Sequence, residues 1–272
     1  IIFSCSIIAV IVFVAVGSRM ITSGDGGTNR YDVEAGNNTY DNAVIENSKI
    51  TEKNKIQNNQ SMLDDIMNST QYPKQLQELA LKNEEALEFV YDYPTEHVKE
   101  HTIDLTEEAS MDSVPLFVQW DKRWGYEKYS GNFFAASGCG PTTLSMVVVY
   151  LTHNRDASPI AVAKYSKEAG YSVDGSGSSW TLISEGCRHY GIKAKTVALD
   201  ESRMKAELDA GHPIVINVGP GDFTDTGHFM VITGYDDEGF SINDPNSIEK
   251  SGKRWLFKNI SSQIRAVWSM YV

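Results

Sequence analysis

Cysteine is scarce in this sequence. Only Cys5, Cys139 and Cys187 occur among 272 residues, and no two of them form a Cys-x-x-Cys pair. Three scattered cysteines neither build a disulfide framework nor supply the paired thiolates of a cysteine-bound zinc site. The sequence therefore argues against a fold held together by disulfides or by such a metal site. Each cysteine is left to be explained as a core residue or as a reactive thiol.

Clusters of positive charge are also missing. The chain has 24 Lys and Arg against 36 Asp and Glu, a formal net charge of -12, and the basic residues gather in no one segment. Nucleic-acid binding relies on basic patches that contact phosphates, so the sequence excludes nucleic acid as a partner. A G-x-x-x-x-G-K-[ST] run is absent as well, which excludes a P-loop nucleotide site in this chain.

The negative charge is concentrated in the N-terminal half. Residues 19–112 carry 8 basic and 19 acidic residues, which accounts for -11 of the total charge. Within this half, residues 18–70 are rich in Asn, Ser, Thr, Gly, Asp and Lys and show no sustained hydrophobic period. We interpret residues 18–70 as a disordered, Asn-rich acidic linker, because they have too few apolar residues to form a core.

The first residues of the chain, unlike the acidic residues that follow them, are hydrophobic. Residues 1–16, IIFSCSIIAVIVFVAV, are uncharged and almost wholly apolar. They fall slightly short of the roughly 20 residues that span a bilayer as a helix, while Ala15 and Gly17 form a small-x-small pattern that a signal peptidase accepts. We expect residues 1–17 to be a membrane anchor or a cleaved signal. The rest of the chain is then extracytoplasmic, either tethered to the cell membrane or secreted.

Residues 71–110 are predicted to form an amphipathic helix followed by a connector. Pro73 suits a first helical turn, and Pro94 is expected to end the helix because the residue before a proline avoids the helical region. Five apolar residues recur at helical spacing between them: Leu76, Leu79, Ala80, Leu87 and Val90. Such a helix must dock its apolar face on another part of the molecule.

Most aromatic residues and glycines follow residue 110, so we expect the core to lie in residues 111–272. Helices are predicted over residues 141–151, 159–169, 179–190 and 201–210. Strands are predicted over residues 192–198, 214–218, 229–235, 240–243 and 266–272. Helices first and mostly hairpin-linked strands later are typical of an α+β domain.

Cys139 lies between two glycines at the point where a helix is predicted to start. The N-terminus of a helix carries about half a positive charge and free N–H groups, so it lowers the pKa of a thiol and can hold an oxyanion. A free cysteine is more often an inert core residue, and we interpret Cys187 in this way. The context Ser-Gly-Cys-Gly-Pro instead predicts that Cys139 is a nucleophile.

A nucleophilic thiol needs a base and a group that orients the base. His228 follows a glycine-rich loop at residues 219–227 and opens the strand His-Phe-Met-Val-Ile. Asp244 ends the next predicted strand, where a hairpin would return it to the neighbourhood of His228. We predict a Cys139, His228 and Asp244 site, although a strand histidine and an Asp-Pro turn each have a purely structural interpretation.

Four segments carry a family resemblance: QWDKRWGY at residues 119–126, SGCGPTT at 137–143, GHFMVITGY at 227–235 and NDPN at 243–246. With them the chain resembles the C39-like peptidases, bacterial members of the papain-like superfamily, over about residues 72–272. The resemblance implies an α+β, papain-like cysteine peptidase fold. In that fold a helical subdomain carries Cys139 and an antiparallel β-sheet carries His228 and Asp244, which places the catalytic domain at residues 111–272.

The resemblance also implies the roles of the residues. Cys139 matches the nucleophile, His228 the base and Asp244 the orienting acid of an enzyme that uses no cofactor or metal and acts on a peptide or protein. Gln119 matches a glutamine that helps form the oxyanion hole, yet that glutamine usually precedes the cysteine by a handful of residues and here lies twenty positions away. Either residues 125–136 are an inserted loop, or Gln119 is structural and the Cys139 N–H and another donor form the hole.

Alternatives remain open. His97-Val-Lys-Glu-His101 matches the H-x-x-E-H pattern of some zinc peptidases, but it lies in an acidic connector without a long apolar helix or an evident third ligand, so we interpret it as solvated. A thioester on Cys139 would also allow transpeptidation if an amine outcompeted water. A peptide-binding module without turnover is the third possibility, although it has no need of a Cys, His and Asp set.

Overall fold

The computed structural model of the chain describes residues 38–272, with side chains from residue 48 onward. Internal contacts divide the chain into residues 1–50 and residues 51–272, and the fold below is that of the second unit. The anchor or signal predicted for residues 1–17 lies outside the described residues. Within residues 38–272, no helix combines the length and the apolar character needed to cross a membrane.

A helix replaces part of the predicted linker. α1 (Asn38–Asn68) has 31 residues, so the disordered interpretation is wrong for this stretch, and residues 18–37 lie outside the described ones. The helix contains neither glycine nor proline. Its last turns also dock: Ile66 is fully buried, and Met62 and Leu63 pack against the same cluster. Tertiary contacts thus stabilise a polar helix that its own sequence would leave marginal.

The predicted helix at residues 72–93 is broken into four short pieces, α2 (Lys74–Lys82), η1 (Glu84–Ala86), α3 (Leu87–Tyr91) and α4 (Tyr93–Glu96). Asn83 causes the first break, because it is extended (φ -135°, ψ 99°) and its side chain accepts a hydrogen bond from the Glu85 N–H. Pro94 lies in the first turn of α4 and does not end the helical segment as expected. The predicted apolar face is nevertheless buried, together with Phe89 and Phe133.

The centre of the molecule is a six-stranded sheet in which all neighbours are antiparallel. Its strand order is β5-β10-β6-β7-β8-β9. The strands are β5 (Lys193–Thr196), β6 (Ile214–Val218), β7 (His228–Asp236), β8 (Gly239–Asn243), β9 (Arg254–Trp255) and β10 (Ile264–Tyr271). The two-residue strand β9 was not predicted, because it is too short to show a period.

The sheet is covered on both faces because its apolar residues alternate between two cores. In β6, Val215 packs in one hydrophobic cluster, whereas Ile214 and Ile216 pack in the other. Helices α6 (Cys139–Thr152), α7 (Pro159–Glu168) and α8 (Thr181–Ser184) share the first cluster, and α9 (Glu201–Asp209) and α11 (Phe257–Ile260) share the second.

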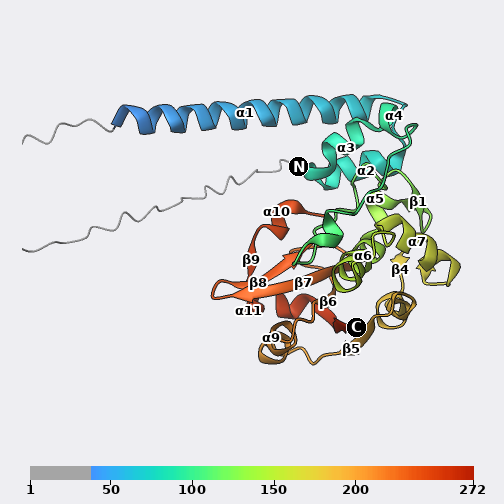
Figure 1. The fold of residues 1–272 in the computed structure, drawn as a ribbon. Helices are drawn as coiled ribbons and strands as arrows, with labels where there is room; N and C mark the ends of the chain where they lie inside the picture. Colours follow the sequence, from blue (N-terminus) through green and yellow to red (C-terminus); the bar gives the residue numbers. More distant parts are fainter. Residues whose placement is uncertain (1–37) are drawn as a thin grey trace, which may run out of the picture. The chain divides into compact units, whose positions relative to one another are not determined.

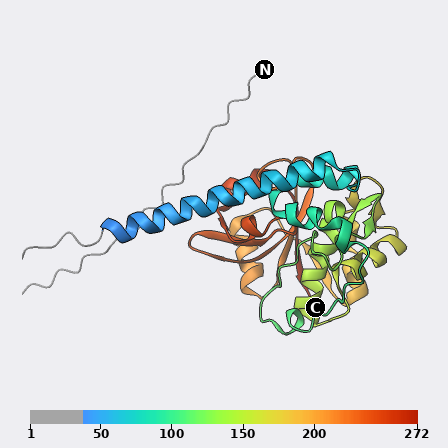
Figure 2. The same cartoon turned by 90° about the horizontal axis from the view of Figure 1, so that it is seen from above.

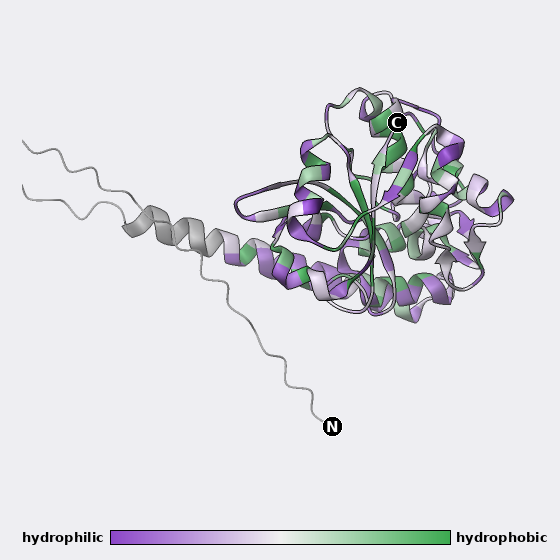
Figure 3. Ribbon diagram, turned by 90° about the horizontal axis from the view of Figure 1, so that it is seen from below, coloured by the Kyte–Doolittle hydropathy of each residue, from purple (hydrophilic) through white to green (hydrophobic). Residues whose placement is uncertain are grey.

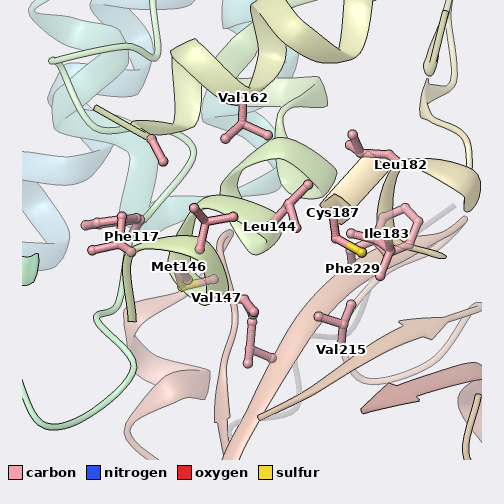
Figure 4. Packing of buried hydrophobic residues seen from close by; sticks show 14 of the residues in the cluster. Phe117, Leu144, Met146, Val147, Val162, Leu182, Ile183, Cys187, Val215 and Phe229 are labelled. Carbon is pink, nitrogen blue, oxygen red and sulfur yellow. The ribbon is translucent and has the colours of Figure 1, made fainter. Parts of the chain in front are cut away.

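The figures follow this arrangement. Figures 1 and 2 show the green helices on one side of the sheet and the orange α9 on the other. Figure 3 shows that the central strands are largely hydrophobic, and Figure 4 shows the first cluster, where Leu144 and Val147 of α6 face Val215 and Phe229. The predicted class, a mixed domain of helices and antiparallel strands, is confirmed.

One predicted helix is split. Residues 179–190 form α8 and then η3 (Gly186–Tyr190), a 3-10 helix. Gly186 lies at the join, where an added Cβ would be 3.0 Å from the ring of Tyr171, so a side chain there would force the ring to shift. Gly191 ends the segment in the left-handed region (φ 77°), as predicted for a helix stop.

Two small hairpins lie apart from the main sheet. One pairs β1 (Lys128–Tyr129) with β2 (Asn132–Phe133), and the other pairs β3 (Ser172–Val173) with β4 (Gly177–Ser178). The remaining short elements are η2 (Glu108–Ser110), α5 (Phe134–Ser137), α10 (Ile248–Ser251) and η4 (Ser261–Gln263).

Candidate active site

Cys139 is the first residue of α6, and the glycines beside it are required by packing. A Cβ on Gly138 would be 2.6 Å from the ring of Phe134, and one on Gly140 would be 2.6 Å from Ser178 Oγ. Pro141 suits the first turn of a helix, where its missing N–H has no partner to lose. The Gly-Cys-Gly-Pro sequence therefore lets α6 start against two neighbouring segments while the sulfur remains partly exposed.

His228 and Asp244 are brought together by a hairpin. β7 starts at His228, turns at residues 237–238 and returns as β8, so that Asp244 directly follows the end of the returning strand. His228 Nε2 lies 2.7 Å from Asp244 Oδ1, and the two side chains are only 7% and 1% exposed. Because Nε2 faces the carboxylate, Nδ1 is the ring nitrogen left for another partner.

Cys139 lies close enough to His228 for the two side chains to shift each other's pKa. Burial by itself would raise the pKa of Cys139, but a hydrogen bond with His228 and the charge of that ring lower it below its ordinary value, assisted by backbone hydrogen bonds with Phe229 and Gly140. Burial would likewise lower the pKa of His228, but Asp244 and Cys139 raise it. Both shifts favour a thiolate next to an imidazolium.

Hydrogen bonds to the central sheet hold the elements that carry Cys139 and His228. Thr143 Oγ1 donates to the Phe229 carbonyl oxygen at 3.0 Å, which ties α6 to β7. Asn217 Nδ2 donates to the His228 carbonyl oxygen at 3.2 Å, which ties β6 to the same strand. Cys139 and His228 therefore sit on elements that are cross-linked by buried hydrogen bonds.

Gln119 is buried, with 4% of its surface exposed. Its Nε2 donates to the Ala135 carbonyl oxygen at 2.7 Å, and its backbone N–H donates to the Pro245 carbonyl oxygen at 2.7 Å. The structure thus places Gln119 between the segment that precedes Cys139 and the residue that follows Asp244. Its Oε1 has no hydrogen-bond partner among the described residues.

A cleft of about 530 Å³ opens at Cys139. One wall comes from Ser130 and Gly131 of the β1–β2 turn and from the glycine-rich β3–β4 hairpin, and the other includes Asn217 and Phe229. Trp180, 47% exposed, also lines the cleft and packs edge-on against Trp268. The first wall therefore consists mostly of backbone and short polar side chains.

Ser130 holds the two hairpins of the wall together. It has a positive φ of 53°, which is strained for a residue with a side chain. Its Oγ donates to the Val173 carbonyl oxygen and accepts from the Gly177 N–H at 3.0 Å, while its carbonyl oxygen accepts from the Gly175 N–H at 3.0 Å. These bonds offset the strain and fix the shape of the cleft.

The other candidate groups have different surroundings. His97 Nδ1 contacts the Tyr93 carbonyl oxygen and His101 Nε2 the Glu96 carbonyl oxygen, in a separate cavity of about 470 Å³. No group of three or more His, Cys, Asp or Glu among the described residues is arranged to hold a metal. Cys187 is fully buried in the first cluster, and burial raises its pKa to about 11.

Sequence reasoning missed Asn217 and Trp180. Asn217 interrupts the apolar run Ile-Val-Ile-Asn-Val, and a buried amide in a central strand is a signal that could have been followed. For Trp180, the sequence predicted only a position within the helix at residues 179–190. Its exposure depends on the packing of β10, which no local pattern reveals.

Parts of this chain are similar to known proteins. A family model described as Peptidase_C39 like family matches residues 111–272. Among solved structures, the peptidase domain of Streptococcus ComA, a bi-functional ABC transporter involved in a quorum sensing pathway, is 19% identical with a TM-score of 0.39, covering 50% of this chain and 90% of that one. A putative C39-like peptidase from Bacillus anthracis is 17% identical with a TM-score of 0.37, covering 58% and 95%. The curated proteins gave no match.

Proposed function

Because the chain belongs to the Peptidase_C39 like family, we propose that it is a cysteine peptidase or amidase in which Cys139 attacks, His228 is the base and Asp244 orients the base. The observation that carries this proposal is the arrangement around His228. Its Nε2 is 2.7 Å from a buried carboxylate, and the ring lies close enough to Cys139 to lower the pKa of the thiol at the start of α6. This is the nucleophile, base and orienter order that acyl transfer requires.

The reaction starts from the thiolate and the imidazolium. The sulfur of Cys139 attacks the carbonyl carbon of the scissile amide, and the carbonyl π electrons move to oxygen. His228 then gives its proton to the leaving nitrogen, the C–N bond breaks and a thioester remains. Neutral His228 takes a proton from water, the resulting hydroxide adds to the thioester, and the thiolate leaves with the acid as the second product.

The negative oxygen formed during attack needs hydrogen-bond donors. In our proposal they are the N–H groups at the start of α6 and the amide of Gln119. Its Nε2 carries two hydrogens, of which the Ala135 carbonyl oxygen takes one. The second hydrogen is the one assigned to the oxyanion, and replacement of such a donor typically lowers kcat by about 10² to 10³.

The proposed substrate is a peptide or protein outside the cytosol. The uncharged, apolar character of residues 1–16 supports export, with residues 1–17 as anchor or signal. Protease treatment of intact cells tests this part. Digestion of residues 51–272 from outside supports it, whereas full protection in intact cells together with digestion after lysis contradicts it.

Alkylation and peptide cleavage test the chemistry. Intact-protein mass spectrometry after iodoacetamide treatment is expected to show rapid labelling of Cys139, which is lost in Cys139→Ala and slowed in His228→Ala. A peptide library with added water-soluble amines then separates hydrolysis from transpeptidation by the mass of the products. A Cys139 that reacts like an ordinary thiol, with no peptide turned over, would leave only the binding-module interpretation.

A further inference from the structure

We propose that Asn83 and Glu85 are positioning residues for the active site, because they hold the loop at residues 244–247 and, through it, the contact between His228 and Asp244. Both lie outside residues 111–272, the part that matches the family. The inference rests on the proposed function, since it concerns how the proposed base is oriented. It gives the N-terminal helical segment a role beyond packing.

Glu85 binds the end of the loop through its carboxylate. The carboxylate accepts hydrogen bonds from the Ser247 hydroxyl, from the Ile248 N–H at 2.7 Å and from the Glu249 N–H at 3.0 Å. These donors lie at the start of α10, where N–H groups have no partner within the helix. A single carboxylate from η1 therefore determines where α10 begins and where the preceding loop ends.

Asn83 binds the middle of the same loop. Its Nδ2 donates to the Asn246 carbonyl oxygen at 2.9 Å and to Asn246 Oδ1 at 3.1 Å. Its Oδ1 accepts from the Glu85 backbone N–H at 3.0 Å, so the Asn83 side chain is tied to the backbone of Glu85. Trp120 Nε1 supports the same carbonyl oxygen at 3.2 Å. The extended conformation that breaks the helix at Asn83 is what presents these groups to the loop.

The loop contacts the Asp244 carboxylate through one oxygen. Asp244 Oδ1 accepts from the Asn246 N–H at 2.8 Å and lies 2.7 Å from His228 Nε2. Asp244 Oδ2 is buried and has no hydrogen-bond partner among the described residues. The Asn246 N–H is therefore the backbone group that orients the carboxylate toward His228, and a displaced Asn246 would rotate that carboxylate or weaken its contact.

The test uses the full chain with Glu85→Gln and Asn83→Ala. Glu84→Gln is the matched control, because Glu84 lies on the same turn and accepts instead from Asn59 Nδ2 of α1 at 2.8 Å. The rate of iodoacetamide labelling at Cys139 is measured against pH, 15 °C below the melting temperature of each protein. This readout follows the thiolate and not merely the amount of folded protein.

We expect the labelling pKa of Cys139 to rise by about one unit in Glu85→Gln and Asn83→Ala, which slows labelling about tenfold on the acid side. Glu84→Gln is expected to keep the profile of the original chain. Unchanged profiles in both variants, beside a low labelling pKa in the original chain, would overturn this inference and leave the proposed function intact. An ordinary thiol profile in the original chain would overturn both.

Discussion

Two histidines within residues 111–272 contact a carboxylate, and the two sites are built differently. His228 lies at the start of β7 and contacts Asp244 at 2.7 Å, with side chains that are 7% and 1% exposed. His212 precedes β6, on the α9 side of the domain, and its Nδ1 contacts Glu207 Oε2 at 3.1 Å, with side chains that are 32% and 16% exposed. The pairs resemble each other in chemistry but differ in what surrounds them.

The surroundings decide what each pair can do. Glu207 also binds Lys195 Nζ at 2.8 Å and accepts from the Ser269 hydroxyl at 2.8 Å. Together with the bond to His212, these two bonds lower the pKa of Glu207 to about 2. The Ser269 hydroxyl is fully buried and already donates to the carboxylate. The ring of His212 packs against Tyr271. The His228 pair is buried and close to Cys139, whereas the His212 pair belongs to a partly exposed cluster with Lys195 and Ser269.

The largest expected effect separates the two histidines. His228→Ala removes the group that pairs with the thiolate and protonates the leaving amine, so we expect kcat/KM for peptide cleavage to fall by about 10³ or more. His212→Ala is expected to leave kcat/KM within about twofold of the original value, as for most substitutions outside an active site. Steady-state kinetics on one peptide would measure both. Equal losses of kcat/KM in the two variants would mean that the surroundings of His228 and His212 do not tell which histidine is the base.

The carboxylates give the second comparison. Asp244→Asn keeps the shape of the side chain but weakens its hold on the imidazolium, so we expect kcat to fall by about 10², while the fold is retained. Glu207→Gln leaves a partly neutralised cluster with Lys195 and His212 and is expected to cost about 1 to 3 kcal/mol of stability with little change in kcat. Urea unfolding and kinetics on the same preparations are the measurements. A stable but inactive Glu207→Gln would contradict the assignment.

The two thiols provide a third comparison, made in a Cys5→Ala background. The lowered pKa of Cys139 and the burial that raises the pKa of Cys187 to about 11 predict selective labelling of Cys139 at neutral pH, by about tenfold or more. Peptide mapping after brief iodoacetamide treatment locates the label. Comparable labelling of Cys187 in the folded protein would show that the environment at α6 does not activate its thiol.

The smallest expected effect is a difference in how stability depends on pH. The pKa of Glu207 is lowered from 4.5 to about 2, so its contribution is present above pH 4.5 and is lost as the pH falls toward 2. The pKa of His228 is raised from 6.5 to about 10, so its contribution is present below pH 6.5 and is lost as the pH rises toward 10. The melting temperature of Glu207→Gln should therefore differ in pH dependence from that of the original chain at acidic pH. The melting temperature of His228→Ala should differ in pH dependence at alkaline pH.

Local patterns predicted the mixed fold and the residues of the candidate site. The glycines around Cys139, the apolar run after His228 and the Asp-Pro pair at 244–245 are all short-range signals. They led to three residues that the structure brings close together, of which Cys139 lines the cleft. Their catalytic roles remain predictions.

The structural features that the sequence did not predict have a common cause. The break at Asn83, the order in α1 and the contacts of Gln119 each depend on a partner far away in the sequence, such as Asn246 for Asn83. Period and propensity describe a segment by itself, so they cannot report a polar side chain that is satisfied by another segment. The same limit explains why Asn217 was overlooked.

The hairpin that pairs His228 with Asp244 has a consequence for the order of folding. These two residues are 16 positions apart, whereas the bond from Thr143 to Phe229, which brings α6 to the same strand, spans 86 positions. Closing the longer loop costs more chain entropy, so His228 and Asp244 can meet before Cys139 arrives. A thiol of low pKa would then arise only at the last step of refolding, and the onset of iodoacetamide reactivity would time the completion of the native structure.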